Sequence, residues 1–250
     1  MKHRKRKIAL LVIGSILLAM IIGLAVYVSI YYPADDTAQA ALHSDEQVTV
    51  TEQDGRLVFA PEHPQVGLIF YPGGKVEYRA YAPLLHTLAR HNVLSIAVEM
   101  PFQLAVLRPQ AADGIREDYP SIRRWYIGGH SLGGSMAAVY AAQHTDTLEG
   151  LILLAAYSNT DLSHSSLRVL SLYGSEDGVL NYDKYRDNRH YLPEDTTEVV
   201  LQGGCHAYFG SYGAQRGDGH PTITPTEQIQ QTVQHIVTWI QPPLQKAAVP

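Results

Sequence analysis

A strand, a sharp turn and a helix follow one another in Trp125–Gly134, which reads WYIGGHSLGG. Its first residues are aromatic or β-branched, as in a strand, and small residues continue to Ala142, as in a closely packed helix. Residues 129–133 match the pattern G-x-S-x-G, in which the serine occupies a strained turn between a strand and a helix. We therefore predict that Ser131 is a nucleophile. The alternative is a glycine-rich turn without chemistry.

Strand and helix patterns alternate on both sides of this turn. Strands are predicted at Val48–Thr51, Leu57–Ala60, Val66–Tyr71, Val93–Val98, Arg124–Ile127, Leu151–Ala155, Leu167–Tyr173 and Thr197–Leu201. A helix is predicted to begin at Thr224, because Thr224, Pro225 and Glu227 supply an N-cap, a first-turn proline and a capping box. The alternation predicts a largely parallel sheet flanked by helices, in one domain over residues 47–243, followed by a tail over 244–250.

The first 32 residues combine a basic cluster with a long uncharged run. Lys2–Lys7 contains five basic and no acidic side chains, and Ile8–Tyr32 is 25 residues without a charge. As a helix that rises ~1.5 Å per residue, this run exceeds the ~30 Å hydrocarbon core of a bilayer. Because Lys and Arg stay on the cytoplasmic side, residues 1–32 are predicted to be a signal anchor that places the domain outside the cell membrane. A signal peptide cleaved near the small-residue sequence Ala38–Ala40 is the alternative, and 33–46 is expected to be a polar linker.

The composition excludes several classes of protein. With 46% hydrophobic and 17% charged residues, the chain is typical of a folded globular protein. The net charge of −5 includes the basic N-terminal cluster, so the rest of the chain is more acidic and would repel nucleic acid. The single cysteine, Cys205, can form no intramolecular disulfide and is too little for a structural zinc site. We expect Cys205 to be a small packed residue.

A serine hydroxyl needs a base within hydrogen-bond reach and an acid that orients the base. On this kind of turn the acid and the histidine follow the serine in that order. His206 comes directly after the last predicted strand, at the carboxyl edge of the sheet, and is the predicted base. His190, in a polar helical stretch, and His220, in the same loop as His206, are alternatives. His235 is expected to pack among the apolar residues of its helix.

The predicted acid is Asp177, which follows the strand Leu167–Tyr173. Glu176 is one residue away and Asp161 follows the preceding strand, so either could substitute. Asp177-Gly178 is also a common turn dipeptide, and a surface turn is the alternative.

Acyl transfer also needs backbone N–H groups that stabilise the developing oxyanion. Tyr71–Lys75 ends a strand with two glycines, which let the main chain approach a substrate carbonyl. Either Gly74 or Lys75 is predicted to supply one donor, and the N–H of Leu132, directly after the nucleophile, the other. A flexible glycine turn is the alternative.

Several of these motifs, in order, resemble the α/β-hydrolase superfamily, and most closely its bacterial fold-5 group of small carboxylesterase-like proteins. They are Tyr71–Lys75, Met100-Pro101, Trp125–Gly134, Leu154–Tyr157, Tyr173–Gly178 and Gly203–Asp218. The resemblance covers residues 48–241. It implies an eight-stranded sheet, a triad of Ser131, Asp177 and His206, and hydrolysis of a carboxylic ester or related acyl bond without metal or organic cofactor. Cys205 and Tyr208 depart from the Asn and Gln that this group often has there, which affects substrate preference.

Three loops bear on the substrate, which is expected to be a small or surface-presented ester. The connection Ser158–Ser166 is too short for a lid domain, so the site is expected to be open. The long loop Gly203–Thr224, with Tyr208, Phe209 and Tyr212, is expected to wall an acyl pocket. Met100–Phe102 is either another wall or core packing. Asp218 is expected at most to hold its own loop in place.

An acyltransferase with the same triad and a catalytically silent binding module remain alternative functions.

Overall fold

The computed structural model describes residues 2–241, which form two compact units. The first unit ends at Tyr31 and contains helix α1 (Lys2–Ser29). Over Leu10–Ser29 this helix is long and apolar enough to cross a membrane, a test of length and composition that a signal sequence also passes. The second unit begins at Tyr32 and contains all the strands.

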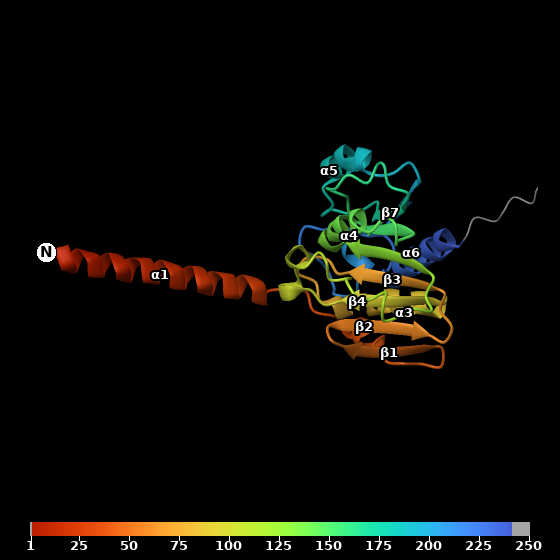
Figure 1. Cartoon of the computed structure of the whole chain (residues 1–250), viewed down its shortest axis with the longest axis horizontal. Coiled ribbons are helices and arrows are strands. Elements are labelled where there is room, and N and C mark those ends of the chain that lie inside the picture. The colour runs from red at the N-terminus through yellow and green to blue at the C-terminus, as the bar shows by residue number, and fades with distance from the viewer. Residues whose placement is uncertain (1, 242–250) are drawn as a thin grey trace, which may run out of the picture. The chain divides into compact units, whose positions relative to one another are not determined.

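The eight strands form one sheet in the order β1-β2-β4-β3-β5-β6-β7-β8 (Figure 1). They are β1 (Val48–Gln53), β2 (Arg56–Pro61), β3 (Val66–Tyr71), β4 (Val93–Val98), β5 (Arg124–His130), β6 (Gly150–Leu154), β7 (Arg168–Gly174) and β8 (Thr196–Leu201). β2 pairs with β1 and β4 in antiparallel register, and the remaining neighbours are parallel. The predicted eight-stranded, mostly parallel sheet is therefore confirmed.

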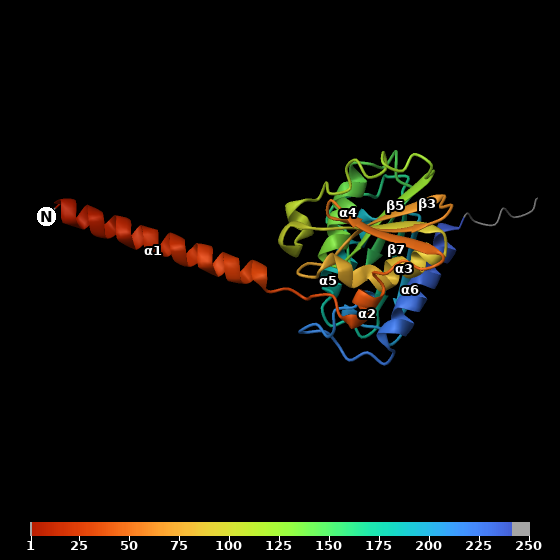
Figure 2. The same ribbon diagram turned by 90° about the horizontal axis from the view of Figure 1, so that it is seen from below.

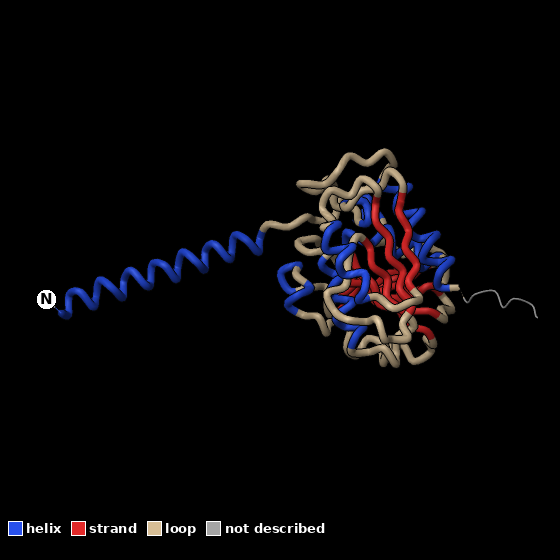
Figure 3. Tube along the Cα trace, turned by 90° about the horizontal axis from the view of Figure 1, so that it is seen from above, coloured by secondary structure: helices blue, strands red, loops and turns tan. Residues whose placement is uncertain are grey.

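Helices cover both faces of this sheet (Figures 2 and 3). The helices of the second unit are α2 (Asp36–Ala40), α3 (Ala82–Arg90), α4 (Leu132–Ala142), α5 (Tyr182–Asp187) and α6 (Pro225–Ile240), with short 3₁₀ turns η1 (Tyr78–Tyr81), η2 (Pro101–Gln103), η3 (Ala105–Leu107), η4 (Asn188–Tyr191) and η5 (Ala207–Phe209). Side chains alternate along each strand, so Leu68 and Phe70 of β3 join the apolar layer of α3 and α6, whereas Ile69 and Tyr71 join that of α4. All six side chains of β3 are buried, as expected for a central parallel strand.

Residues 33–46 differ from the expected linker, because much of this segment packs against the rest of the second unit. Ala38 of α2 is fully buried, and Asp35 caps this helix by accepting a hydrogen bond from the Ala38 N–H at 3.0 Å. The N–H of Asp35 donates to the carbonyl of Ser211 at 2.9 Å, and that of Ala34 to the Glu77 carboxylate at 3.0 Å. Hydrogen bonds to residues far along the chain therefore order residues 33–46, although the composition of this segment predicts a flexible polar linker.

The capping box of α6 is confirmed and allows a test of local stability. Thr224 Oγ1 accepts from the Glu227 N–H, and the Glu227 carboxylate accepts from the Thr224 N–H at 2.7 Å. Thr224→Ala should lower the free energy of unfolding by about 1 kcal/mol and the melting temperature by about 2–4 °C. The control is Thr238→Ala, at an exposed position of the same helix, which should change the free energy of unfolding by less than about 0.5 kcal/mol. Equal losses in the two variants would contradict a capping role.

Candidate active site

Ser131 lies on the turn between β5 and α4, with φ 52° and ψ −123°. This is a backbone conformation that residues with a side chain seldom adopt. Two hydrogen bonds hold it, because the Ser131 N–H donates to the Leu154 carbonyl at 2.9 Å and its carbonyl accepts from the Ser135 N–H at 3.1 Å. The turn is therefore fixed between the central strands and the first turn of α4.

Glycines allow α4 to approach the sheet closely enough for this turn. A Cβ atom at Gly133 would lie 2.2 Å from the carbonyl oxygen of Pro72 and 2.3 Å from that of Tyr71. A Cβ atom at Gly129 would lie 2.6 Å from the carbonyl carbon of Gly133. Those neighbours are main-chain atoms that cannot move aside, so both glycines of the G-x-S-x-G pattern are required by packing.

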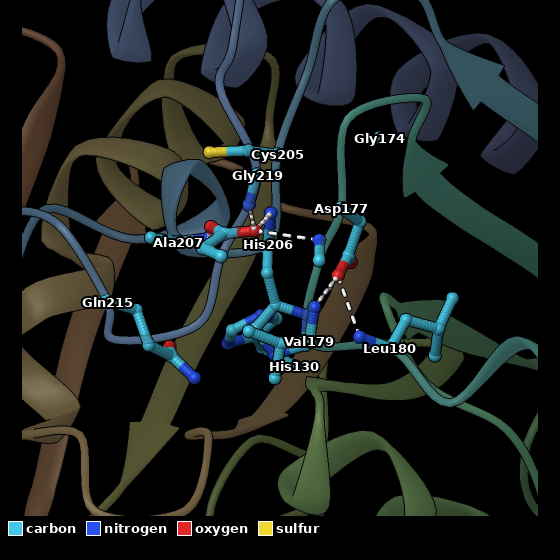
Figure 4. A network of polar contacts seen from close by, with 12 residues as sticks. His130, Gly174, Asp177, Val179, Leu180, Cys205, His206, Ala207, Gln215 and Gly219 are labelled. Carbon is cyan, nitrogen blue, oxygen red and sulfur yellow. Dashed lines mark hydrogen bonds and ion pairs between the residues drawn. The ribbon is translucent and has the colours of Figure 1, made fainter.

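His206 and Asp177 form a buried hydrogen-bonded pair (Figure 4). His206 Nδ1 lies 2.8 Å from Asp177 Oδ2, and their side chains are 2% and 0% exposed. The other oxygen of Asp177 accepts from the N–H groups of Val179 at 2.8 Å and Leu180 at 2.7 Å. Because the carboxylate fixes Nδ1, the ring is oriented with Nε2 as the nitrogen left for proton transfer.

Ser131 and His206 line the same pocket, which has a volume of about 280 Å³. Within the described residues, His206 Nε2 is buried without a hydrogen-bond partner, so the Ser131 hydroxyl is not bonded to it here. Hydrogen bonds of this kind often tighten only when substrate binds. The other lining residues are Leu132, Ser135, Met136, Ala155, Ala156, Tyr157, Asn159, Val179, Leu180 and Asn181. A larger hollow of about 490 Å³ lies beside Val66 and Val93, at the amino ends of their strands, and contains none of the candidate groups.

The loop after β3 lies against the first turn of α4. A Cβ atom at Gly74 would lie 3.0 Å from Cδ2 of Leu132, so the two segments are in close contact. Leu132 is the first residue of α4, and its N–H has no acceptor within the helix. The N–H of Lys75 already donates to the carbonyl of Gln103 at 2.7 Å. Of the two candidate oxyanion donors in this loop, Lys75 is therefore the one whose N–H is already engaged.

His130 and Tyr81 are two site residues that the sequence did not reveal. The hydroxyl of Tyr81 accepts from the Gly73 N–H at 2.9 Å and lies 2.8 Å from His130 Nδ1. The ring centroid of His130 is 4.5 Å from that of His206. Burial, and then the nearby His206, lower the pKa of His130 well below its ordinary value, so this ring is neutral. The position of His130 inside the G-x-S-x-G pattern was the only available signal.

Asp218 joins the loop of the candidate acid to the loop of the candidate base. Its Oδ1 accepts from the N–H groups of Gly178 at 3.0 Å, His206 at 3.1 Å and Gly219 at 2.9 Å, and its Oδ2 from Ala207 at 2.8 Å. Burial raises the pKa of Asp218, but these four donors lower it by more, so the net pKa lies below its ordinary value. The expectation that Asp218 holds only its own loop is therefore too narrow.

The alternative residues lie outside this cluster. His190 and His220 are exposed and do not line the pocket, and the same is true of Glu176 and Asp161. His235 is also exposed, so the expectation that it packs among apolar side chains is wrong. Its helix presents it to solvent, while the apolar stripe of α6 faces the sheet.

The long loop Gly203–Thr224 contributes only His206 to the pocket lining, so it does not form the expected acyl wall. Phe209 is fully buried, with its ring 5.7 Å from that of His130. Tyr212 is also buried, and its ring packs 5.6 Å from that of Tyr32. Phe209 therefore packs beside His130, whereas Tyr212 packs against the start of the second unit.

Two further expectations concern Cys205 and Met100–Phe102. Cys205 is 2% exposed, its N–H donates to Gln228 Oε1 at 2.9 Å, and burial raises the pKa of its thiol to about 12. It is a packed residue, as expected. Met100 is buried and Phe102 is 57% exposed, and neither lines the pocket, so Phe102 is not a pocket wall.

The role of Asp218 can be tested through stability. In Asp218→Asn an amide NH₂ replaces one acceptor oxygen, which should cost about 1–3 kcal/mol in the free energy of unfolding at neutral pH. Because the folded pKa of Asp218 is lowered, its contribution is present above the unfolded pKa and disappears as pH falls through the folded pKa. The difference from wild type in urea unfolding should therefore shrink in acid.

The matched control is Asp183→Asn, since the Asp183 side chain is 86% exposed on α5. It should lose less than about 1 kcal/mol. A deficit of Asp218→Asn that is the same at every pH would refute the assignment of these hydrogen bonds to the ionised carboxylate.

Solved structures of three proteins share this fold. The predicted CIB-like hydrolase from Thermoplasma acidophilum is 16% identical, with 77% of this chain and 98% of that chain covered and a TM-score of 0.54. Est1E from Butyrivibrio proteoclasticus is 15% identical, with 78% and 98% covered and a TM-score of 0.53. TT1662 from Thermus thermophilus is 15% identical, with 78% and 99% covered and a TM-score of 0.58. At these identities the likeness establishes the fold alone.

No curated protein is significantly similar to this chain in sequence. A sequence model of the alpha/beta hydrolase family, however, matches residues 67–231, which is more than half of the chain. The matched residues include the turn at Ser131 and the pair formed by Asp177 and His206. The chain therefore belongs to the alpha/beta hydrolase family, as its motifs indicated.

Proposed function

We propose that this protein is a serine hydrolase that cleaves a carboxylic ester, or a related acyl bond, through an acyl-enzyme on Ser131. The observation that carries the proposal is the 2.8 Å contact between His206 Nδ1 and Asp177, which leaves Nε2 of this ring without a partner among the described residues, in a residue that lines the same pocket as Ser131. One of the proteins with a similar fold is described as a predicted hydrolase, which is consistent with it.

In the proposed reaction, His206 Nε2 takes the proton of the Ser131 hydroxyl as its oxygen attacks the acyl carbon. Asp177 holds the imidazole in the tautomer with a proton on Nδ1 and stabilises the imidazolium that forms. The N–H groups of Gly74 and Leu132 stabilise the oxyanion. His206 then protonates the leaving alcohol, and a water molecule repeats the sequence on the acyl-enzyme to release the acid.

The surroundings support this division of roles. A neutral His130 adds no positive charge beside the imidazolium of His206, and the hydroxyl of Tyr81 holds His130 and Gly73 together. The pocket lining is mixed: Met136, Val179 and other apolar side chains share it with Asn159 and Asn181, and the apolar part suits an acyl group.

We further propose that α1 anchors the enzyme in the cell membrane with its catalytic unit outside. The support is the length and apolar character of Leu10–Ser29 and the basic residues Lys2–Lys7 that precede it.

A fluorophosphonate probe tests the nucleophile. Wild-type protein should be labelled and Ser131→Ala should not, because the probe forms a covalent bond with an activated serine. Ser135→Ala is the matched control, since Ser135 lines the same pocket but its hydroxyl donates to the Tyr157 carbonyl at 2.7 Å. Labelling that survives in Ser131→Ala and disappears in Ser135→Ala would identify Ser135 as the nucleophile and contradict the proposal.

Kinetics on a soluble ester test whether the three residues act as one unit. Ser131→Ala and His206→Ala should each lower kcat by about 10⁴–10⁶-fold, and the double variant should be little slower than either. Asp177→Asn should lower kcat by about 10⁴-fold, because the imidazole loses the acceptor that fixes its tautomer. Additive losses in the double variant, or near-normal turnover of Asp177→Asn, would contradict the triad.

The pH profile separates the proposed base from the nearby thiol. Only a neutral imidazole can accept the serine proton, so kcat/KM for an ester should rise with pH through one ionisation. The thiol of Cys205 is not its source, because burial raises the pKa of that thiol to about 12. Cys205→Ser should therefore keep the rising limb with an unchanged midpoint, and its loss in a folded variant would overturn the serine–histidine mechanism.

A further inference from the structure

Three large apolar side chains project into solvent from one short loop after β4. Phe102, Val106 and Leu107 are 57%, 52% and 55% exposed. Among the described residues 32–241, no other large apolar side chain is this exposed. We call Pro101–Leu107 the apolar loop; it is drawn in yellow in Figure 1, beyond the carboxyl ends of β3 and β4. A cluster of exposed large apolar side chains within one short loop is typical of a surface that binds a partner or a membrane.

The apolar loop is fixed at the edge of the candidate active site. The carbonyl of Gln103 accepts from the N–H of Lys75 at 2.7 Å, and Lys75 adjoins the proposed oxyanion donor Gly74. Phe102 and Gln103 both have positive φ, at 54° and 56°, which residues with a side chain rarely adopt. Local hydrogen bonds hold this conformation, including Gln103 N–H to the Met100 carbonyl at 2.9 Å. The three side chains are thus presented by a defined loop.

The chain enters the second unit at this same edge. The N–H of Tyr32 donates to the Lys75 carbonyl at 2.7 Å, and the Glu77 N–H donates to the Tyr32 carbonyl at 3.0 Å. Only Ile30 and Tyr31 separate Tyr32 from Ser29, the last residue of α1. Three residue steps span at most ~11 Å. A bilayer that holds α1 therefore lies within a short covalent tether of the loop that carries Gly74 and Lys75.

This tether identifies the occupant of the apolar surface. It keeps one bilayer permanently at high effective concentration beside the apolar loop, which no free partner can match. Phe, Leu and Val side chains suit the boundary between headgroups and acyl chains, and the exposed Arg108 beside them suits lipid phosphates.

We propose that Phe102, Val106 and Leu107 dock on the lipid bilayer in which α1 is anchored, and that the pocket at Ser131 takes its ester from that bilayer. The substrate class is then an ester of a membrane-embedded amphiphile. This inference rests on the proposed hydrolase activity and on membrane anchoring by α1.

Lipid quenching tests the docking without reference to catalysis. Full-length Cys205→Ser protein is reconstituted in phosphatidylcholine and phosphatidylglycerol vesicles that contain nitroxide-labelled lipid. It carries bimane on a cysteine at Val106→Cys or, as the control, at Glu62→Cys. Glu62 is 87% exposed and lies in the turn before β3, at the opposite edge of the sheet. Bimane at position 106 should be quenched several-fold more strongly than at position 62. Equal quenching at the two positions would overturn the docking.

Activity tests the substrate class. Phe102→Ser/Val106→Ser/Leu107→Ser should lower kcat/KM by about tenfold or more on a long-chain fluorogenic ester held in the vesicles, and by less than about twofold on soluble p-nitrophenyl acetate. Equal loss on both esters, or no loss on either, would refute the proposal, as would wild-type protein that cleaves only the soluble ester. Ser131→Ala separates a failure of the docking proposal from a failure of the proposed function. If Ser131→Ala leaves the rates on both esters unchanged, the serine mechanism is wrong. The quenching experiment then still tests whether the apolar loop docks on the bilayer.

Discussion

The close approach of α4 to the central strands is the constraint on which the rest of the site depends. Gly129 and Gly133 leave room for main-chain atoms to meet where any Cβ would collide, and Ser131 can then occupy its left-handed turn between β5 and α4. The same approach leaves the Leu132 N–H at the start of the helix without an acceptor and sets Gly74 against Leu132. The turn at the proposed nucleophile and the N–H groups proposed as oxyanion donors therefore depend on the same packing contact.

Two carboxylates, the buried Asp177 and the half-buried Asp218, order the other half of the site. Asp177 divides its two oxygens between the His206 ring and the N–H groups of its own loop, and Asp218 accepts from N–H groups of both loops. Each N–H would be costly to bury without an acceptor, so the carboxylates stabilise loops that contain little regular structure. The position of His206, the proposed base, thus depends on backbone hydrogen bonds as much as on its contact with Asp177.

The carboxyl edge of the sheet gathers every feature that bears on function. The turn at Ser131, the pocket, the entry of the chain at Tyr32 and the apolar loop all lie there, as open parallel sheets generally arrange their ligand sites. An anchored hydrolase of this design would meet its substrate and its membrane at the same edge. Because only Ile30 and Tyr31 separate Ser29 from Tyr32, anchoring by α1 would be compatible with access of a membrane-borne substrate to this edge.

The sequence by itself determined the eight strands, the capping box of α6 and the identity of the turn at Ser131, because these follow from local periodicity and from close packing at glycine. The order of motifs was also sufficient to nominate Asp177 and His206, which the fold brings to 2.8 Å. Only the tertiary structure distinguishes the two candidate oxyanion donors Gly74 and Lys75, since the N–H of Lys75 donates to the carbonyl of Gln103, 28 residues away. It also placed His130 beside Tyr81 and packed residues 33–46 against the rest of the second unit. Each of these depends on partners distant in sequence, whose contacts no local pattern encodes.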